Sequence, residues 1–331
     1  MGRMHRVSAR RSPIEIGLLN NMPDALLHAT ERQFTHLLRA AAGAHEVRLR
    51  FFSLPEVPRG EYTRTYMRAI YGDLDEMLDA GLDGLIVTGA DSGAADMADQ
   101  PYWDRLTQVI DWSEVNLAAS YWSGQAAQAA VRHLDGVRHI ALGARLSGVF
   151  ESEPVGDDPM LAHLPAPIRT PHSRLIGLDE QELSAYGYGV ITRSAEAGVD
   201  MFVRRDRSLM VFGQGHPEYD ADTLLHEFCR DADAYLRNGR GALPAVPIGY
   251  LNRKIERAFA VLARRESNLA LMDRYDAIAA VARPRQTWRS SAVALFRNWL
   301  HHIAASKAKA ARARLRAQSR VQSRTGSSAH P

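Results

Sequence analysis

Short runs of apolar residues alternate with longer amphipathic stretches along the first two thirds of the chain. Five runs rich in Ile, Val and Leu have the length of buried strands: Ile14–Asn20, Glu46–Leu54, Gly84–Thr88, Leu117–Ser123 and Leu209–Gly213. Stretches with helical periodicity of apolar residues separate several of these runs. Such alternation is typical of a parallel sheet covered by helices. We therefore predict an α/β fold, a parallel sheet flanked by helices.

Two of the predicted helices have recognisable ends. After the first strand, Asp24 can cap a helix that Gly43 is placed to end. Another helix, Gln125–Leu134, ends near Gly136 and begins directly after the strand that closes at Ser123. The sequence therefore predicts a sharp strand-to-helix turn at this point.

Three turns follow predicted strands and should share one cleft. They are Thr88-Gly89-Ala90, Ser123-Gly124-Gln125 and the segment from Gly213 to His216. In open α/β sheets, ligands bind beyond the carboxyl ends of the strands. We expect these turns to converge there.

The last third of the chain differs in composition. Leu243–Ile248 is rich in proline, Leu251–Ala282 is a charged Ala/Leu-rich segment typical of one long or two shorter helices, and Thr287–Ile303 is again apolar and aromatic. We divide the chain into a basic N-terminal extension (1–12), a main domain (13–240 with 286–303), a helical insertion (241–285) and a flexible basic tail (304–331).

Positive charge is concentrated at the two ends of the chain. Eleven of the 41 Lys and Arg residues lie in 1–12 and 304–331, which hold none of the 38 Asp and Glu residues, so the part between is acidic. A basic tail can contact nucleic acid or anionic lipid. Residues 306–331 contain no aromatic side chain on which bases could stack, so any nucleic-acid contact should be non-specific. A solvated tail without a specific partner is the simpler interpretation.

Cys229 is the single cysteine, which excludes an internal disulfide and a multi-cysteine metal site. No apolar run approaches the roughly 20 residues that span a bilayer. We expect a cytoplasmic protein that holds no metal and acts on small molecules, with a homodimer as an open possibility.

Several short motifs occur in an order and spacing that together identify a family. They are Gly17-Leu18-Leu19-Asn20 with Met22-Pro23, Asp83–Ala90, Leu146-Ser147-Gly148-Val149, Pro171-His172-Ser173-Arg174, Gly215–Asp220 and Thr287–Leu300. With these motifs the chain resembles the homoserine O-succinyltransferases and O-acetyltransferases of methionine biosynthesis. The resemblance implies a class I glutamine-amidotransferase-like fold and acyl transfer to homoserine. It also implies succinyl-CoA, or acetyl-CoA, as co-substrate, with no permanently bound cofactor.

The resemblance assigns three catalytic positions, one of which has changed. His216 matches the family's catalytic base and Glu218 the carboxylate that orients it. The family's nucleophilic cysteine, which takes the acyl group from coenzyme A, falls on Gly124. Cys229 cannot replace it, because it lies in the helical run 223–236, where a small buried residue is expected.

Four further positions are implied to bind substrate. Arg230 matches an arginine that holds the amino-acid carboxylate, for which bidentate pairing suits arginine. Ser173 matches a residue that contacts the amino acid, and Arg145 stands where the family has a lysine. Gly93 matches a position that selects the acyl donor, where glycine leaves room for a succinyl group.

The change at Gly124 leaves three interpretations open. Ser123 could serve as the nucleophile, activated by His216. Alternatively, His216 could deprotonate the acceptor hydroxyl for direct attack on the thioester, with backbone N–H groups of the turn holding the oxyanion. In the third, the reaction is lost and a ligand-binding or regulatory protein remains, or one that acts on another amino-acid alcohol.

Overall fold

A ten-stranded sheet runs through the part of the chain that the computed structural model describes, residues 12–89, 97–238, 243–263 and 269–326. Six strands at one side are parallel, and the other four pair antiparallel. In spatial order they are β3 (Tyr71–Gly72), β2 (Val47–Phe52), β1 (Ile14–Leu19), β4 (Gly84–Thr88), β5 (Ala119–Ser123), β10 (Leu209–Gly213), β9 (Gly198–Arg205), β8 (Gly189–Ser194), β6 (His139–Pro154) and β7 (Ile168–Leu178).

The five strands expected from the apolar runs make up most of the parallel side. Thr88 of β4 and Gly213 of β10 both lie opposite Ser123 of β5, so three strands end side by side. Gly89 lies against Gln125 and Gly124 against His216, so the described parts of the three turns converge at one edge of the sheet, while Ala90 lies outside the described residues. The predicted class, a mostly parallel α/β sheet flanked by helices, is confirmed.

The antiparallel side is not apparent from the apolar pattern. Exposed positions dominate the first half of β6, and β7 contains Arg169, His172 and Arg174. Neither strand forms a continuous apolar run. They are strands because β6 and β7 pair with each other along most of their length, from His139 opposite Leu178 to Ser152 opposite Ile168.

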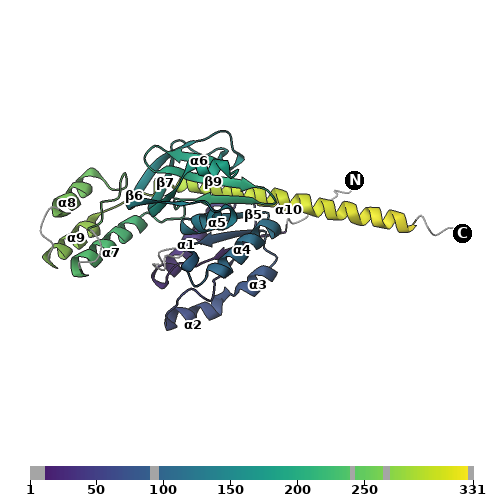
Figure 1. The fold of residues 1–331 in the computed structure, drawn as a ribbon, viewed down its shortest axis with the longest axis horizontal. Helices are drawn as coiled ribbons and strands as arrows, with labels where there is room; N and C mark the ends of the chain where they lie inside the picture. Colours follow the sequence, from purple (N-terminus) through teal and green to yellow (C-terminus); the bar gives the residue numbers. More distant parts are fainter. Residues whose placement is uncertain (1–11, 90–96, 239–242, 264–268, 327–331) are drawn as a thin grey trace, which may run out of the picture.

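Helices cover both faces of the sheet (Figure 1). Apolar side chains of α1 and the first part of α10 pack on one face, and those of α3, α4 and α5 on the other. The helices and 3₁₀ turns of the described residues are α1 (Asp24–Ala41), α2 (Glu61–Ile70), α3 (Leu74–Asp79), η1 (Met97–Asp99), α4 (Trp103–Asn116), α5 (Gln125–Asp135), η2 (Pro159–Leu161), α6 (Glu180–Ala185), α7 (Thr223–Asn238), α8 (Arg253–Ala263), α9 (Leu269–Val281) and α10 (Arg289–Gly326).

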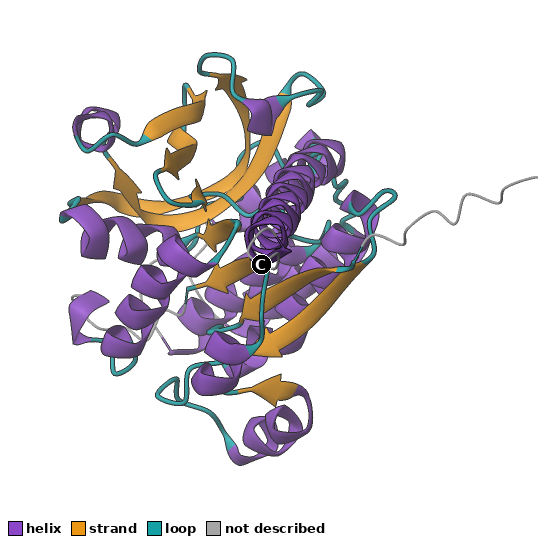
Figure 2. Ribbon diagram, turned by 90° about the vertical axis from the view of Figure 1, so that its right-hand side faces the viewer, coloured by secondary structure: helices purple, strands orange, loops and turns teal. Residues whose placement is uncertain are grey.

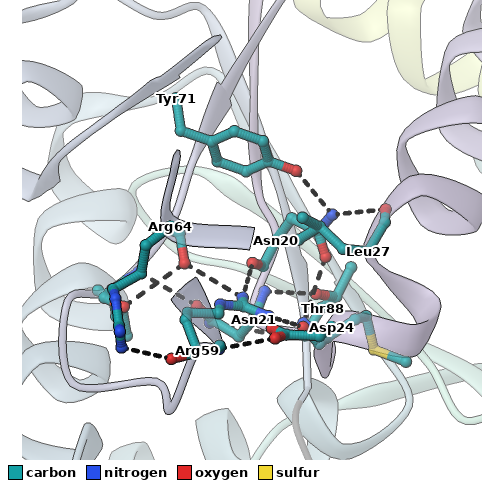
Figure 3. A network of polar contacts seen from close by, with 12 residues as sticks. Asn20, Asn21, Asp24, Leu27, Arg59, Arg64, Tyr71 and Thr88 are labelled. Atoms are coloured by element: carbon teal, nitrogen blue, oxygen red, sulfur yellow. Dashed lines mark hydrogen bonds and ion pairs between the residues drawn. The ribbon is translucent and has the colours of Figure 1, made fainter. Parts of the chain in front are cut away.

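The turn after β1 is held by a polar network rather than by the helix cap expected at Asp24. Pro23 occupies the N-cap of α1, and the Asp24 carboxylate instead accepts a hydrogen bond from the N–H of Gly60 at 2.8 Å. Beside it, the guanidinium of Arg59, whose side chain is 6% exposed, donates to the carbonyls of Asn20 and Met22 (Figure 3). This network fixes the chain at the carboxyl end of β1, next to Thr88.

The C-terminal segments form two distinct structures. Within the expected insertion, α8 and α9 pack with α7 around Phe228, Phe259 and Tyr275. Helix α10 buries Trp299, then continues through the expected tail as far as Gly326 and projects beyond the body (Figure 1). Figure 2 views this helix from its C-terminal end. The expected boundary between domain and tail therefore lies inside one helix.

Candidate active site

Gly124 forms a strand-to-helix elbow between β5 and α5. Its φ of +57° and ψ of −118° belong to a region that residues with a side chain rarely adopt. The N–H of Gly124 donates to the carbonyl of Gly213 at 2.8 Å, which joins the elbow to the end of β10. A sharp turn of this kind presents the residue at its apex to the cleft.

The imidazole of His216 faces the apex of this elbow. A Cβ atom placed on Gly124 would lie 2.9 Å from Cε1 and 3.4 Å from Nε2 of His216. The Nδ1 of His216 is 2.9 Å from Oε1 of Glu218, whose side chain is only 5% exposed. The structure therefore brings Gly124, His216 and Glu218 together, with His216 between the elbow and the carboxylate.

Ser123 contacts the carboxylate of this group. Its hydroxyl donates to Oε1 of Glu218 at 3.2 Å, the oxygen that also contacts His216, and the residue is 3% exposed. A serine nucleophile would instead need its hydroxyl at the free nitrogen of the base. The geometry thus disfavours Ser123 as the substitute nucleophile, because its side chain points to the orienting carboxylate.

The charges around His216 favour its protonated form. Burial lowers the pKa of His216, but the carboxylates of Glu218 and Glu227 outweigh burial, so the pKa is raised above its ordinary value. Tyr219 stacks on the imidazole with ring centroids 4.4 Å apart and donates its hydroxyl to Glu227 at 2.8 Å. The ring is therefore held from both its Nδ1 edge and one face.

The expected substrate-binding residues form a second group. Arg145 donates to the hydroxyl of Ser173 at 3.3 Å and lies 3.6 Å from a carboxylate oxygen of Asp231. The other oxygen of Asp231 accepts from Arg230 at 2.9 Å. The structure therefore brings Arg145, Ser173 and Arg230 together, and Asp231 links the two arginines. Gly93 lies outside the described residues.

Sequence reasoning missed Tyr219, Glu227 and Asp231. The sequence held one indication of Glu227: it precedes Arg230 by three residues, so the two side chains share a face of α7 and Glu227 could be expected near the same site. Tyr219 lies in the Gly215–Asp220 motif, but its stacking on His216 depends on the path of the loop.

Cys229 is partly buried, rather than fully buried as the sequence suggested. It packs against the cluster formed by α7, α8 and α9. Burial, together with Asp276, raises the pKa of the Cys229 thiol to about 11, so the thiol is a poor nucleophile near neutral pH.

The described residues form neither a cluster suited to a metal ion nor a helix suited to a membrane. No cluster of three or more His, Cys, Asp or Glu side chains in these residues could hold a metal ion. None of the helices formed by the described residues has the length and apolar character to cross a membrane.

Comparison with known proteins identifies the family. The family model described as homoserine O-succinyltransferase matches residues 1–310. The chain is 45% identical to the homoserine O-succinyltransferase of Rhodopseudomonas palustris over 300 residues, which cover 90% of each protein. It is 42% identical to that of Methylorubrum extorquens, covering 87% of this chain and 86% of the relative. A glutamine amido transferase structure from Methylobacillus flagellatus aligns with a TM-score of 0.48 and 16% identity, over 88% of this chain and 94% of that chain. By the family match and these identities, the chain belongs to the homoserine O-succinyltransferase family.

Proposed function

We propose that the protein transfers the succinyl group of succinyl-CoA directly to the hydroxyl of L-homoserine, in methionine biosynthesis. The observation that carries this proposal is the His216–Glu218 pair facing an elbow that has no side chain. Loss of the nucleophile from a triad costs on the order of 10⁶ in rate when the reaction depends on it. Direct transfer needs the base but no nucleophile.

In this proposal, His216 acts as the general base on the acceptor. Its Nδ1 donates to Glu218, which leaves a lone pair on Nε2 in the neutral ring. That nitrogen faces the space above Gly124, where the homoserine hydroxyl would sit in place of a thiol. As His216 takes the proton, the hydroxyl oxygen attacks the thioester carbonyl.

The elbow supplies the site for the negative charge that develops on the carbonyl oxygen. The N–H groups of Gln125 and Ala126 have no acceptor within the helix and can donate to this oxyanion, whereas that of Ala127 donates to the carbonyl of Gly124. The N–H of Gly124 is not available because it donates to Gly213. When the tetrahedral intermediate collapses, the C–S bond breaks, and His216 returns its proton to the departing thiolate of coenzyme A.

The arginine group supports recognition of the two substrates. Homoserine carries one carboxylate and the succinyl group another, and Arg145 and Arg230 are cations suited to such groups. Ser173 adds a hydroxyl beside Arg145. The third interpretation, a non-catalytic binding protein, has no support among the matched relatives, which bear the enzyme's name.

Initial-rate kinetics of the purified protein test the proposal. Release of free coenzyme A thiol, with succinylhomoserine identified by mass, should require both substrates. Direct transfer predicts intersecting double-reciprocal lines and no acyl adduct on the intact protein, whereas a covalent intermediate predicts parallel lines. Cys229→Ala should retain activity and His216→Ala should lose it. Acetyl-CoA serves as the competing donor. No thiol release above background, or an adduct on Ser123, would contradict direct transfer.

A further inference from the structure

Asp200 is a buried carboxylate in the antiparallel part of the sheet, and it is 1% exposed. Its Oδ2 accepts hydrogen bonds from the hydroxyls of three strands: Ser152, Thr170 and Thr192, at 3.1 to 3.2 Å. Burial would raise the pKa of Asp200, but His172 and the hydroxyls of Thr170 and Thr192 outweigh it, so the pKa is lowered. A charged carboxylate is therefore retained in the interior, which is costly unless its neighbours compensate the charge.

His172 lies beside this carboxylate and is also fully buried. Its Nε2 is 3.1 Å from Oδ1 of Asp200, without the alignment of an ideal hydrogen bond. The Nε of Arg174 donates to Nδ1 of His172 at 3.3 Å, so Nδ1 is an acceptor and the proton of the neutral ring is on Nε2, toward Asp200. Burial lowers the pKa of His172, which keeps the ring neutral.

The segment that carries His216 is attached to the strands of this pair. The N–H of Gln214 donates to the carbonyl of Asp200, and the N–H of His216 donates to the carbonyl of Pro171, both at 2.8 Å. Between them, a Cβ on Gly215 would lie close to Cγ2 of Thr170 and 2.9 Å from Nε2 of His172. The backbone of Gly215 therefore packs against Thr170 and the His172 ring, one residue before the proposed base.

We propose that Asp200 and His172 form a positioning unit that holds the Gln214–His216 segment so that the imidazole of His216 lies over Gly124. The unit acts through the backbone of this segment. The buried carboxylate fixes the His172 ring, and the ring supports the backbone of Gly215. The hydrogen bonds of the Gln214 and His216 N–H groups then fix the backbone position of His216 beside the sheet. The relevance to catalysis rests on the proposed function, but the position of His216 can be measured without acyl transfer.

A thiol introduced by Gly124→Cys reports that position, because a nearby imidazolium accelerates alkylation in mildly acidic buffer. The charged or titratable groups facing His216 are Glu218 and Tyr219 on its own loop, Glu227 on α7, and Arg174 and His172 on β7. Asp200→Asn leaves these residues in place but removes a negative charge that raises the pKa of His172 and of Arg174, so His172→Gln, which retains the Asp200 carboxylate, is measured beside it. Tyr188→Phe, which removes a hydrogen bond to Asp135 elsewhere in the fold, is the matched control.

Adding Asp200→Asn should slow alkylation of the new thiol at least about tenfold, while Tyr188→Phe leaves the rate unchanged. Circular dichroism and thermal melting show whether each variant is folded. A folded Asp200→Asn variant that alkylates at the parental rate would overturn the proposal. If Asp200→Asn does not fold, the alkylation rates of His172→Gln and His172→Ala, each combined with Gly124→Cys, test the proposal instead. Glutamine can still accept from Arg174 and donate to Asp200, so it should retain fast alkylation and alanine should not. Equal rates in these two variants would also overturn the proposal.

Discussion

Restoring a thiol at the elbow by Gly124→Cys should produce a cysteine far more reactive than Cys229. The new Cβ would lie 2.9 Å from Cε1 of His216, so the ring must move by a few tenths of an ångström. The backbone conformation adds a cost of about 1–3 kcal/mol for a residue with a side chain. Both costs are small enough for the variant to fold, so the thiol should occupy the space in front of His216.

The expected reactivity follows from the thiolate populations. The pKa of Cys229 is about 11, so roughly one thiol in 10⁴ is ionised near neutral pH. A thiol next to an imidazolium and a helix N-terminus has a pKa of about 7 or below, so roughly half or more is ionised. The intrinsic nucleophilicity of a thiolate falls with its pKa, which reduces the net advantage to about 100-fold in alkylation rate.

Iodoacetamide labelling followed by intact-protein mass spectrometry measures this ratio, with Cys229→Ala as the control that isolates the new thiol. His216→Ala in the same background should remove the advantage. Incubation with succinyl-CoA should leave a covalent succinyl adduct that His216→Ala abolishes. Slow alkylation together with no adduct would show that a thiol at position 124 does not lie beside His216, and would refute the conclusion that the family's catalytic geometry is retained.

Four further outcomes are expected. Ser123→Ala removes one hydrogen bond to Glu218, worth about 1 kcal/mol, and should lower kcat about fivefold; a loss near 10⁶-fold would instead identify a nucleophile. His216 acts as a base only when neutral, and its pKa is raised above the ordinary value, so kcat/KM should fall as the pH drops through this raised pKa. A fall in kcat/KM that begins only below the ordinary histidine pKa of about 6.5 would contradict the assignment. Phe259→Ala should lower the free energy of unfolding by about 3–5 kcal/mol in urea titration, whereas a negligible change would mean that α8 contributes little to the fold. Truncation after Lys309 should leave the melting temperature and kcat unchanged, since residues 310–318 are exposed, and a lower melting temperature would show that the distal helix supports the body.

Five of the six parallel strands and the turn at Gly124 could be predicted from the pattern of residues, and the resemblance paired His216 with Glu218. Apolar runs reveal strands that are buried on both faces, and the glycine after Ser123 reveals a turn, because these features depend on neighbouring residues. The resemblance placed the base and its carboxylate on one loop. The missing thiol was also visible in the sequence alone.

The contacts between side chains distant in the sequence could not be predicted without the assembled fold. Strands β6 and β7 carry polar and exposed residues, so their pairing depends on partners distant in the chain. Ser123 could face the base or the carboxylate, and the register of β5 directs its hydroxyl to Glu218. His172 and Asp200 come from different strands, and no local pattern shows that they meet beneath Gly215. Long-range pairing and side-chain direction are set by the assembled sheet, where a shift of one residue would turn each side chain to the other face.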